Sequence, residues 1–350
     1  GAPDGKIQRQ EMKYLNQTVL AAALAVAGIS SAEPFKVIVP MSADDEGAMA
    51  RLVNYDNGTT VDSVLVADGM AVFEGQIDEP VLGRVTYDGG RLPIFILESG
   101  TISLGKDGAF FGTMLNDQLR SMGQKMQQLG AKYQSAADDK EREAVYKAYG
   151  AALDSAMTAN ADNALGYFYF LQGDAPQADA AGLRALFERY PSFAAYERSK
   201  KMLANAERRE ATGPGAKFTD FEVEYNGEKS RLSDYVGRGH YTLVDFWASW
   251  CGPCIRQTVV LKDIYNKYKD KGLEVLGVAV WDEPDATLRA IEQHQLPWKS
   301  IIGAGTIPTD LYGITGIPCI ILFGPDGTII SRDKQDDALR ADVDAAMAGK

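Results

Sequence analysis

Side chains that carry reactive chemistry are scarce in this chain of 350 residues. It has three cysteines, Cys251, Cys254 and Cys319, and two histidines, His240 and His294. Three cysteines exclude a Cys₄ zinc site and cannot build the disulfide framework of a small secreted scaffold. Two histidines argue against most hydrolytic sites that use an imidazole base. We therefore expect neither a metal site nor a cofactor.

Basic residues are also fewer than acidic residues. Lys and Arg total 36 against 48 Asp and Glu, which gives a formal net charge of −12 and a pI of about 4.8. This balance argues against a nucleic-acid binder and against adhesion to anionic lipid. Hydrophobic residues at 45% and charged residues at 24% are typical of folded soluble proteins. At ~150 residues per domain, the length predicts two or three folded units.

The N-terminal stretch lacks an apolar run long enough to span a bilayer. Its run covers residues 19–29, well short of the ~20 residues that a transmembrane helix needs. A short, weakly positive segment opens at Met12, and the small residues Ser30 and Ala32 fit the cleavage rule of secretory signal peptides. We expect a leader over residues 1–32 and export to the periplasm or cell envelope. No cysteine follows directly, so a lipoprotein anchor has no attachment point; a buried Ala-rich helix is the alternative.

The next part of the chain, residues 33–110, has short β-prone segments punctuated by Gly and Asp. Such spacing predicts a small antiparallel sandwich or barrel. It contains no catalytic constellation, which favours a binding or spacing module. The expected strands cover residues 61–66, 70–77, 81–87, 91–97 and 101–104.

A helical connecting region is expected over residues 111–212. Apolar residues from Leu115 to Tyr133 recur in steps of four and three, the stripe of an amphipathic helix. Core packing accounts for such a stripe more often than a partner groove does. Residues 212–215, Thr-Gly-Pro-Gly, break the helical pattern and predict a boundary. The later expected helices cover residues 139–157, 163–171, 178–190 and 193–209.

Residues 213–350 alternate apolar strands with helices. This alternation predicts an α/β domain with a central sheet flanked by helices. The expected strands cover residues 241–247, 273–280, 317–323 and 328–331, and the expected helices cover residues 254–269, 286–294 and 336–347.

The motif with chemical content lies where the first of these strands gives way to a helix. Cys251 and Cys254 enclose Gly252 and Pro253 and follow Trp250. A thiol at a helix N-terminus faces unpaired backbone N–H groups and the positive end of the helix dipole, which stabilise a thiolate. Free Cys has a pKa of ~8.5, and motifs of this kind lower it to ~7. Pro253 fits the first helical turn because its fixed φ is tolerated there.

Two structural interpretations of the motif compete with a redox role. Half of a zinc site would need a second ligand pair, which neither the histidines nor Cys319 offer at suitable spacing. A structural disulfide across so tight a loop would gain little entropic stabilisation. Redox function is therefore the better explanation of the pair. Cys319 is itself either a small buried hydrophobe or a third thiol that exchanges with the pair.

Several segments of the C-terminal domain resemble a known family. Residues 244–254, Val-Asp-Phe-Trp-Ala-Ser-Trp-Cys-Gly-Pro-Cys, closely resemble the active-site segment of the thioredoxin superfamily. Residues 316–318, Gly-Ile-Pro, and the turn at 324–327 resemble its later landmarks. The lead-in from Phe218 is similar to that of exported thiol:disulfide oxidoreductases of the TlpA/ResA type. The β-rich segment is similar to an uncharacterised domain often found ahead of such modules, which implies no chemistry.

The resemblance implies a role for each matching residue. Cys251 would attack a substrate disulfide, and Cys254 would resolve the mixed disulfide that forms. Pro318 would be a cis-proline against the disulfide, and the Ile317 backbone would bind an extended substrate peptide. Asp245 would be the buried acid behind the second cysteine.

The resemblance also implies a substrate-binding surface at Trp250, Gly252 and Pro253. Trp250 would shield the thiol, although a plain surface aromatic is the alternative. The Gly-Pro dipeptide resembles that of reducing thioredoxins, so we expect reduction of protein disulfides with electrons from an unidentified membrane or envelope donor. The chain departs from the TlpA/ResA pattern at Gln257 and Thr258, where an acid and then a proline are common.

The position of Asp245 in the sequence by itself also makes it a candidate proton acceptor. It lies between Val244 and Phe246, so strand alternation puts its side chain on the opposite face of a sheet that helices cover. Burial without a partner raises the pKa of a carboxyl group toward neutrality, where it can accept a proton from a thiol. An ordinary surface carboxylate is the alternative.

Two other functions compete with the oxidoreductase hypothesis. A peroxiredoxin-like peroxidase shares the fold, but its motif places Thr and Pro three and seven residues before the reactive cysteine, where this chain has Ala248 and Val244. The second is a binding protein whose N-terminal half has the main role. The intact Cys-x-x-Cys pair indicates that redox chemistry persists, and a binding role can coexist with it.

Overall fold

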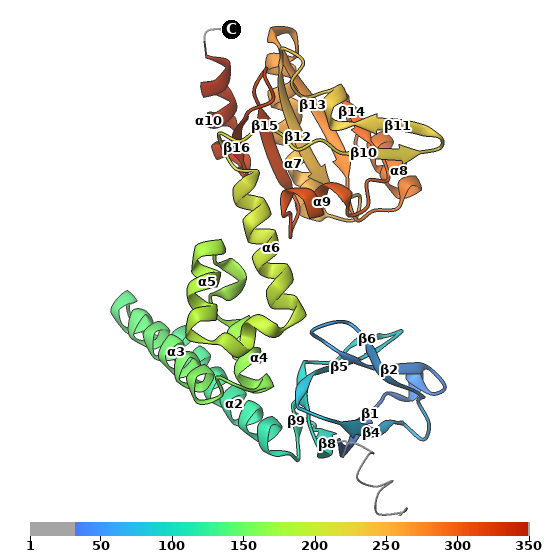
Figure 1. The fold of residues 1–350 in the computed structure, drawn as a ribbon, viewed down its shortest axis with the longest axis vertical. Helices are drawn as coiled ribbons and strands as arrows, with labels where there is room; N and C mark the ends of the chain where they lie inside the picture. The colour runs from blue at the N-terminus through green and yellow to red at the C-terminus, as the bar shows by residue number, and fades with distance from the viewer. Residues whose placement is uncertain (1–31, 349–350) are drawn as a thin grey trace, which may run out of the picture. The chain divides into compact units, whose positions relative to one another are not determined.

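The computed structural model describes residues 32–348, so the predicted leader lies outside the described residues except for Ala32. The chain divides into two compact units, one ending at Asp174 and one beginning at Ala175. Figure 1 shows strands and then helices in the first unit, and helices followed by a strand–helix alternation in the second. The finer domain limits suggested by the sequence, at residues 110 and 212, stay predictions. None of the described helices is long and apolar enough to cross a membrane.

Two small sheets form the β-rich part of the first unit. Its strands are β1 (Glu33–Pro40), β2 (Met49–Asn54), β3 (Thr60–Leu65), β4 (Met70–Ile77), β5 (Val81–Tyr87), β6 (Gly90–Arg91), β7 (Phe95–Leu97), β8 (Gly100–Leu104) and β9 (Phe110–Phe111). One sheet has the order β4-β1-β8-β9, and the other has the order β3-β2-β5-β6 with β7 also paired to β5. The β1–β8 pair is parallel, unlike the expected antiparallel arrangement, because the chain returns to the first sheet after crossing the second. Buried side chains such as Phe73 and Phe95 form the core of this part.

Three helices complete the first unit, in the region where the sequence predicts helices. They are α2 (Met114–Ser135), α3 (Asp139–Ala159) and α4 (Ala164–Gln172). The stripe expected to pack in the core is only partly enclosed, since Leu115 is buried but Met122 and Met126 are half-buried. A layer built mainly from α2 and α3 leaves much of each helix facing solvent.

The second unit contains a five-stranded mixed sheet with the order β14-β13-β12-β15-β16. These strands are β12 (Tyr241–Trp247), β13 (Leu273–Ala279), β14 (Lys299–Ile301), β15 (Cys319–Phe323) and β16 (Ile329–Arg332). The central strand β12 is parallel to β13 and antiparallel to β15. A hairpin of β10 (Glu222–Tyr225) and β11 (Glu228–Arg231) precedes the sheet and was not predicted from the sequence.

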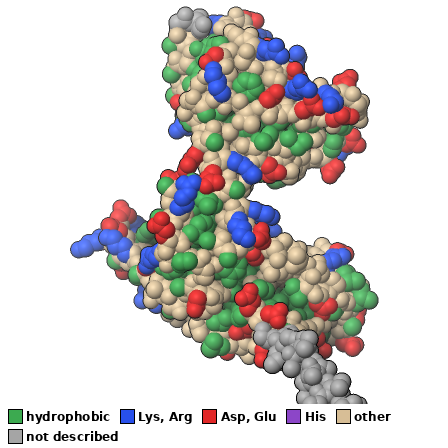
Figure 2. Space-filling view, viewed as in Figure 1, with side chains coloured by type: hydrophobic (Ala, Val, Ile, Leu, Met, Phe, Trp, Pro, Cys, Tyr) green, Lys and Arg blue, Asp and Glu red, His purple; other side chains and the backbone are tan. Residues whose placement is uncertain are grey.

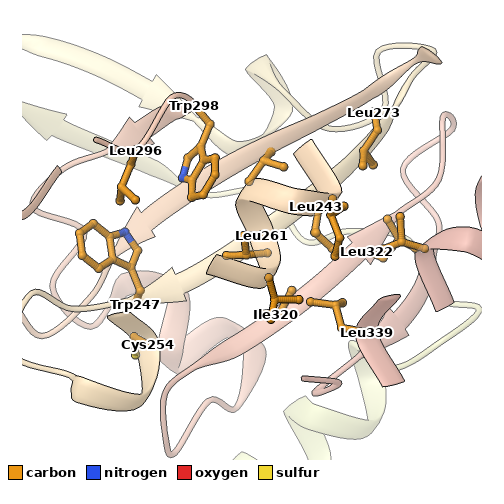
Figure 3. Close-up of a cluster of buried hydrophobic side chains, with 14 of the residues drawn as sticks. Leu243, Trp247, Cys254, Leu261, Leu273, Leu296, Trp298, Ile320, Leu322 and Leu339 are labelled. Carbon is orange, nitrogen blue, oxygen red and sulfur yellow. The ribbon is translucent and has the colours of Figure 1, made fainter. Parts of the chain in front are cut away.

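Helices and two apolar clusters cover the sheet on both faces, as the sequence predicts. The helices are α7 (Gly252–Tyr268), α8 (Pro284–Gln293), α9 (Ile307–Tyr312) and α10 (Asp336–Met347). One cluster, drawn in Figure 3, joins Leu243 and Trp247 to Leu261 of α7 and Leu339 of α10. The other cluster contains Val244 and Phe246 on the opposite face. This mixed sheet between helices is a thioredoxin-like fold.

Two helices that precede the sheet belong to the same unit, α5 (Ala180–Arg189) and α6 (Glu197–Ala211). The C-terminus of α6 is bound by Arg332, whose buried guanidinium donates to the carbonyl oxygens of Thr212 at 3.2 Å and Tyr312 at 2.7 Å. Gly313 has φ +59°, and a Cβ there would lie 2.2 Å from the carbonyl oxygen of Asn205 in α6. Helix α6 is therefore closely packed on the thioredoxin-like fold.

Short 3₁₀ turns lie between several of these helices and strands, and the surface carries side chains of both charges. The turns are η1 (Ala43–Asp45), η2 (Ala175–Gln177), η3 (Pro191–Ala195), η4 (Leu232–Asp234) and η5 (Lys269–Lys271). Figure 2 shows acidic and basic side chains interspersed over the visible face rather than gathered into a basic patch.

Candidate functional site

The two cysteines of the motif lie at the start of α7 and are joined by a disulfide bond. Cys251 is the N-cap residue, and its sulfur accepts a hydrogen bond from the backbone N–H of Cys254 at 3.1 Å. Pro253 lies in the first turn of the helix, as expected from its fixed φ. The first thiol is 3% exposed and the second is fully buried. Cys251 is therefore the more accessible sulfur of the pair.

The loop that leads into β15, the strand next to β12, meets the disulfide. The Ile317–Pro318 peptide bond is cis, as the resemblance implied. The carbonyl oxygen of Ile317 lies 3.8 Å from the sulfur of Cys251. Both loop residues are half-buried, and the extended strand β15 follows directly. The backbone of Ile317 therefore lies directly beside the disulfide.

Asp245 occupies the middle of β12 and is buried, with 2% of its surface exposed. It belongs to the face that carries Leu243 and Trp247, and Cys254 packs on that same face. Its Oδ1 atom has no hydrogen-bond partner among residues 32–348. Burial raises the pKa of Asp245 from 3.8 to about 7. The strand alternation read from the sequence is confirmed, and the surface alternative is wrong.

A polar contact that sequence reasoning missed holds the segment before Cys251. Asp282 accepts hydrogen bonds from the backbone N–H of Ser249 at 2.7 Å, from its hydroxyl at 2.8 Å and from the hydroxyl of Thr287 at 2.8 Å. The indole N–H of Trp250 donates to the carbonyl oxygen of Trp281 at 2.9 Å. These bonds form because β12 and β13 are parallel, so that their carboxyl ends meet at one edge of the sheet.

The structure brings the predicted surface residues together around the disulfide. Trp250 is 62% exposed, and Gly252 and Pro253 are exposed on the helix start beside it. The hydrogen bond to the carbonyl oxygen of Trp281 holds the indole of Trp250 in one orientation. Together, these three residues form an exposed apolar surface next to the sulfur of Cys251.

Cys319 lies apart from the dithiol although it follows the cis-proline directly. Its side chain belongs to the cluster with Val244 and Phe246, the face opposite Cys254. The thiol is buried, and its sulfur lies 3.1 Å from Oδ1 of Asp333. Burial and that carboxylate raise its pKa well above the usual value. This arrangement supports the prediction of a small buried side chain over that of a third exchanging thiol.

Comparison with known families matches the two parts of the chain separately. Residues 214–332 match the model of the AhpC/TSA family, and residues 35–118 match that of a domain of unknown function, DUF4369. Groups of His, Cys, Asp or Glu that could hold a metal ion were not found in the part of the chain that the structure describes.

Curated relatives align with the same C-terminal part. The thiol-disulfide oxidoreductase ResA of Bacillus thuringiensis is 30% identical over 121 residues, which cover 35% of this chain and 66% of that protein. ResA of Halalkalibacterium halodurans is 30% identical over 118 residues, which cover 33% of this chain and 65% of that protein. The chain thus spans just under two thirds of the length of these relatives. A solved thiol-disulfide oxidoreductase of Bacteroides fragilis is 30% identical, with 37% of this chain and 98% of that one covered and a TM-score of 0.34.

Proposed function

Since residues 214–332 form a thioredoxin-like domain of the AhpC/TSA family, with the Cys-x-x-Cys active site of thiol-disulfide oxidoreductases, we propose that this protein is an exported enzyme that reduces protein disulfides. The observation that carries the proposal is the placement of Cys251. It caps α7, its partner Cys254 is buried behind it, and the cis Ile317–Pro318 peptide lies against it.

In the reduced enzyme, Cys251 is the attacking thiolate. The N–H of Cys254 and the positive end of the α7 dipole stabilise its negative charge. The thiolate attacks one sulfur of a substrate disulfide, and the other substrate sulfur leaves as a thiolate. Trp250 and the Ile317 backbone hold the substrate segment at the surface while the mixed disulfide exists.

The second half of the reaction uses the buried thiol. Asp245 accepts the proton of Cys254, whose sulfur then attacks Cys251. The intermolecular bond breaks, the substrate leaves as its second thiolate, and the enzyme holds the disulfide described above. Two electrons have passed to the substrate, so a donor in the membrane or envelope must reduce the enzyme again. The Gly252-Pro253 dipeptide supports the reducing direction.

The roles of the two cysteines are tested by single substitutions. Cys251→Ser should lower the reduction of insulin by dithiothreitol to the rate without enzyme, because no attacking thiolate remains. Cys254→Ser should instead accumulate a mixed disulfide with substrate, visible by non-reducing electrophoresis and mass spectrometry. Cys319→Ser is the matched control and should reduce insulin like the unchanged protein. Equal trapping by both dithiol variants contradicts the assignment.

A peroxidase is the second candidate, since the AhpC/TSA match alone does not separate the two activities. The positions three and seven residues before Cys251 hold the buried side chains of Ala248 and Val244 rather than Thr and Pro. Neither side chain can donate a hydrogen bond to a peroxide. A peroxide-consumption assay run beside the insulin assay decides between them: turnover of peroxide at a rate above that of insulin contradicts the proposed function.

A further inference from the structure

A hollow in the first unit gathers apolar side chains that do not belong to the buried core. It lies where helices α2, α3 and α4 meet the loops before β7 and β9, and Figure 1 shows α3 beside α2 and α4. The hollow has a volume of about 380 Å³, which is within the range of small-molecule sites. It lies wholly in this unit, so it does not depend on the proposed reduction of disulfides.

Apolar side chains form most of the wall. Met122 and Met126 of α2 are one helical turn apart, and both are half-buried although the sequence predicted them in a core. Apolar area that is left exposed on a concave surface gains free energy when a ligand covers it. The other apolar residues of the wall include Ile94, Phe110, Leu119, Leu153 and Phe168.

One polar side chain is buried in the wall. Tyr169 of α4 is 3% exposed, and its hydroxyl has no hydrogen-bond partner among residues 32–348. Burial raises the pKa of Tyr169 to about 12, so the hydroxyl stays protonated at neutral pH. A buried tyrosine hydroxyl usually has a partner, and a protonated phenol is a good donor. The hydroxyl therefore points to a ligand that brings a hydrogen-bond acceptor into the hollow.

The charged groups of the wall neutralise each other. Nη2 of Arg120 lies 2.8 Å from Oδ2 of Asp107, and its Nε donates to the same oxygen at 2.9 Å. The guanidinium also lies 5.0 Å from the ring centre of Phe111. Arg120 and Asp107 are the two charged side chains among the described residues that line the hollow. Since neither charge is left uncompensated, an uncharged ligand fits this wall better than an ion does.

We propose that the hollow binds a small, uncharged apolar molecule with one hydrogen-bond acceptor, such as a ketone oxygen, to which Tyr169 donates. The apolar wall covers the body of the molecule, and the hydroxyl fixes its orientation; small-molecule sites commonly combine these two features. A volume of about 380 Å³ holds a molecule of two fused rings, but it is too small for a helix of a partner protein.

Two naphthalene probes test the site on the full chain. 2-Acetylnaphthalene carries a ketone acceptor, and 2-ethylnaphthalene has nearly the same shape without it. With ¹³C-methyl-labelled methionine, titration of 2-acetylnaphthalene should saturate and should shift the methyl signals of Met122 and Met126. Met202, which lines a different hollow in the second unit, should not shift. Absence of a saturable shift, or shifts confined to other methionines, overturns the proposal.

Removal of the hydroxyl separates the hydrogen bond from the apolar contact. Tyr169→Phe should weaken the binding of 2-acetylnaphthalene about fivefold or more, because the donor to the ketone is lost. The Kd of 2-ethylnaphthalene should stay the same. Tyr146→Phe, at an exposed position on α3 outside the hollow, is the matched control and should change neither Kd. An equal change for both probes, or no change for either, overturns the proposal.

A glycine of α2 allows the hollow to be filled. Gly123 lines it, and a Cβ there would meet no atom within 4 Å. Gly123→Leu should weaken both probes about tenfold or more, since the new side chain takes up space that the probe needs. Gly130 lies on the same helix outside the hollow and also meets no atom within 4 Å, so Gly130→Leu is the matched control. Leucine is favoured over glycine in a helix, and circular dichroism should show both variants folded. Equal binding by the two variants overturns the proposal.

A second copy of the chain is a different occupant that the same spectra detect. Methyl signals of Met122 and Met126 that move with protein concentration before any probe is added would place another copy in the hollow and overturn the proposal. Signals that stay constant over that range support a hollow that is free to take up a small molecule.

Discussion

Burial of Asp245 makes the stability of the thioredoxin-like domain depend on pH. The pKa of this carboxyl group is raised from 3.8 to about 7, and burial is the cause. A shift of about three units corresponds to about 4 kcal/mol, at 1.36 kcal/mol per unit. Ionisation of the Asp245 carboxyl group is therefore unfavourable in the folded state and unhindered in the unfolded state. The buried charge lowers the free energy of unfolding at neutral pH.

The sign of the effect fixes the pH window. Below about pH 4 the group is protonated in both states, and it makes no difference to the free energy of unfolding. As the pH rises from about 4 to about 7, the unfolded chain loses the proton while the folded chain keeps it, so stability falls. Above about pH 7 both states are ionised and the loss stays constant at about 4 kcal/mol. Asp245→Asn removes this loss because an amide does not ionise.

Tryptophan fluorescence can follow this domain alone. All four tryptophans of the sequence, Trp247, Trp250, Trp281 and Trp298, lie in the second unit. Guanidinium unfolding of the oxidised protein between pH 4 and pH 9 should show Asp245→Asn gaining stability over the unchanged protein from pH 4 to 7, by about 4 kcal/mol in total. The exposed Asp270→Asn is the matched control and should show a constant difference.

The same variant should lose activity while it gains stability. Asp245→Asn should slow insulin reduction about tenfold or more near pH 7, with a smaller defect at high pH, where the thiol of Cys254 ionises without help. A stability difference that does not change with pH would refute the burial argument. An unchanged rate across the pH range would refute the proton-transfer role while leaving the burial argument intact.

Three further predictions concern other parts of the chain. Cys319 should resist rapid alkylation in the oxidised native protein, since burial keeps its thiol protonated; fast labelling contradicts the interpretation as a buried side chain. Gly313→Ala should destabilise the domain by about 2 kcal/mol or more, because its backbone is left-handed and Asn205 blocks a Cβ; Gly316→Ala, which meets nothing within 4 Å, is the control in the same fluorescence experiment. Expressed with its leader in a Gram-negative host, the protein should be recovered from the periplasm with Glu33 near its N-terminus, and an intact mass that keeps the leader argues against the signal peptide.

Helices and strands whose apolar residues recur with a clear period were predictable from the sequence alone. The limits of β4 and β5, and those of α10, agree with the expected ranges at both ends. Asp245 was placed on the correct face because strand alternation depends only on parity along the chain. The reactive pair was found for a similar reason, since two thiols at a strand-to-helix junction form a local pattern.

Features that depend on tertiary contacts were not predictable. The hairpin β10–β11 and the helix α9 are short, so their own residues give little periodic signal. The bonds between Asp282 and Ser249 depend on the parallel register of β12 and β13, which brings together residues 33 positions apart.

The contact between Arg332 and the end of α6 has a consequence for the choice of expression fragments. The family match begins at residue 214, after the Thr212 carbonyl and hydroxyl oxygens that accept from this guanidinium. A fragment cut to the family limits would keep the Tyr312 acceptor and the Asp333 carboxylate, but it would leave Nη1 of the buried Arg332 without its Thr212 acceptors, which is costly in a dry environment. An expression fragment that contains the dithiol should therefore include Thr212, upstream of the segment that sequence families delimit.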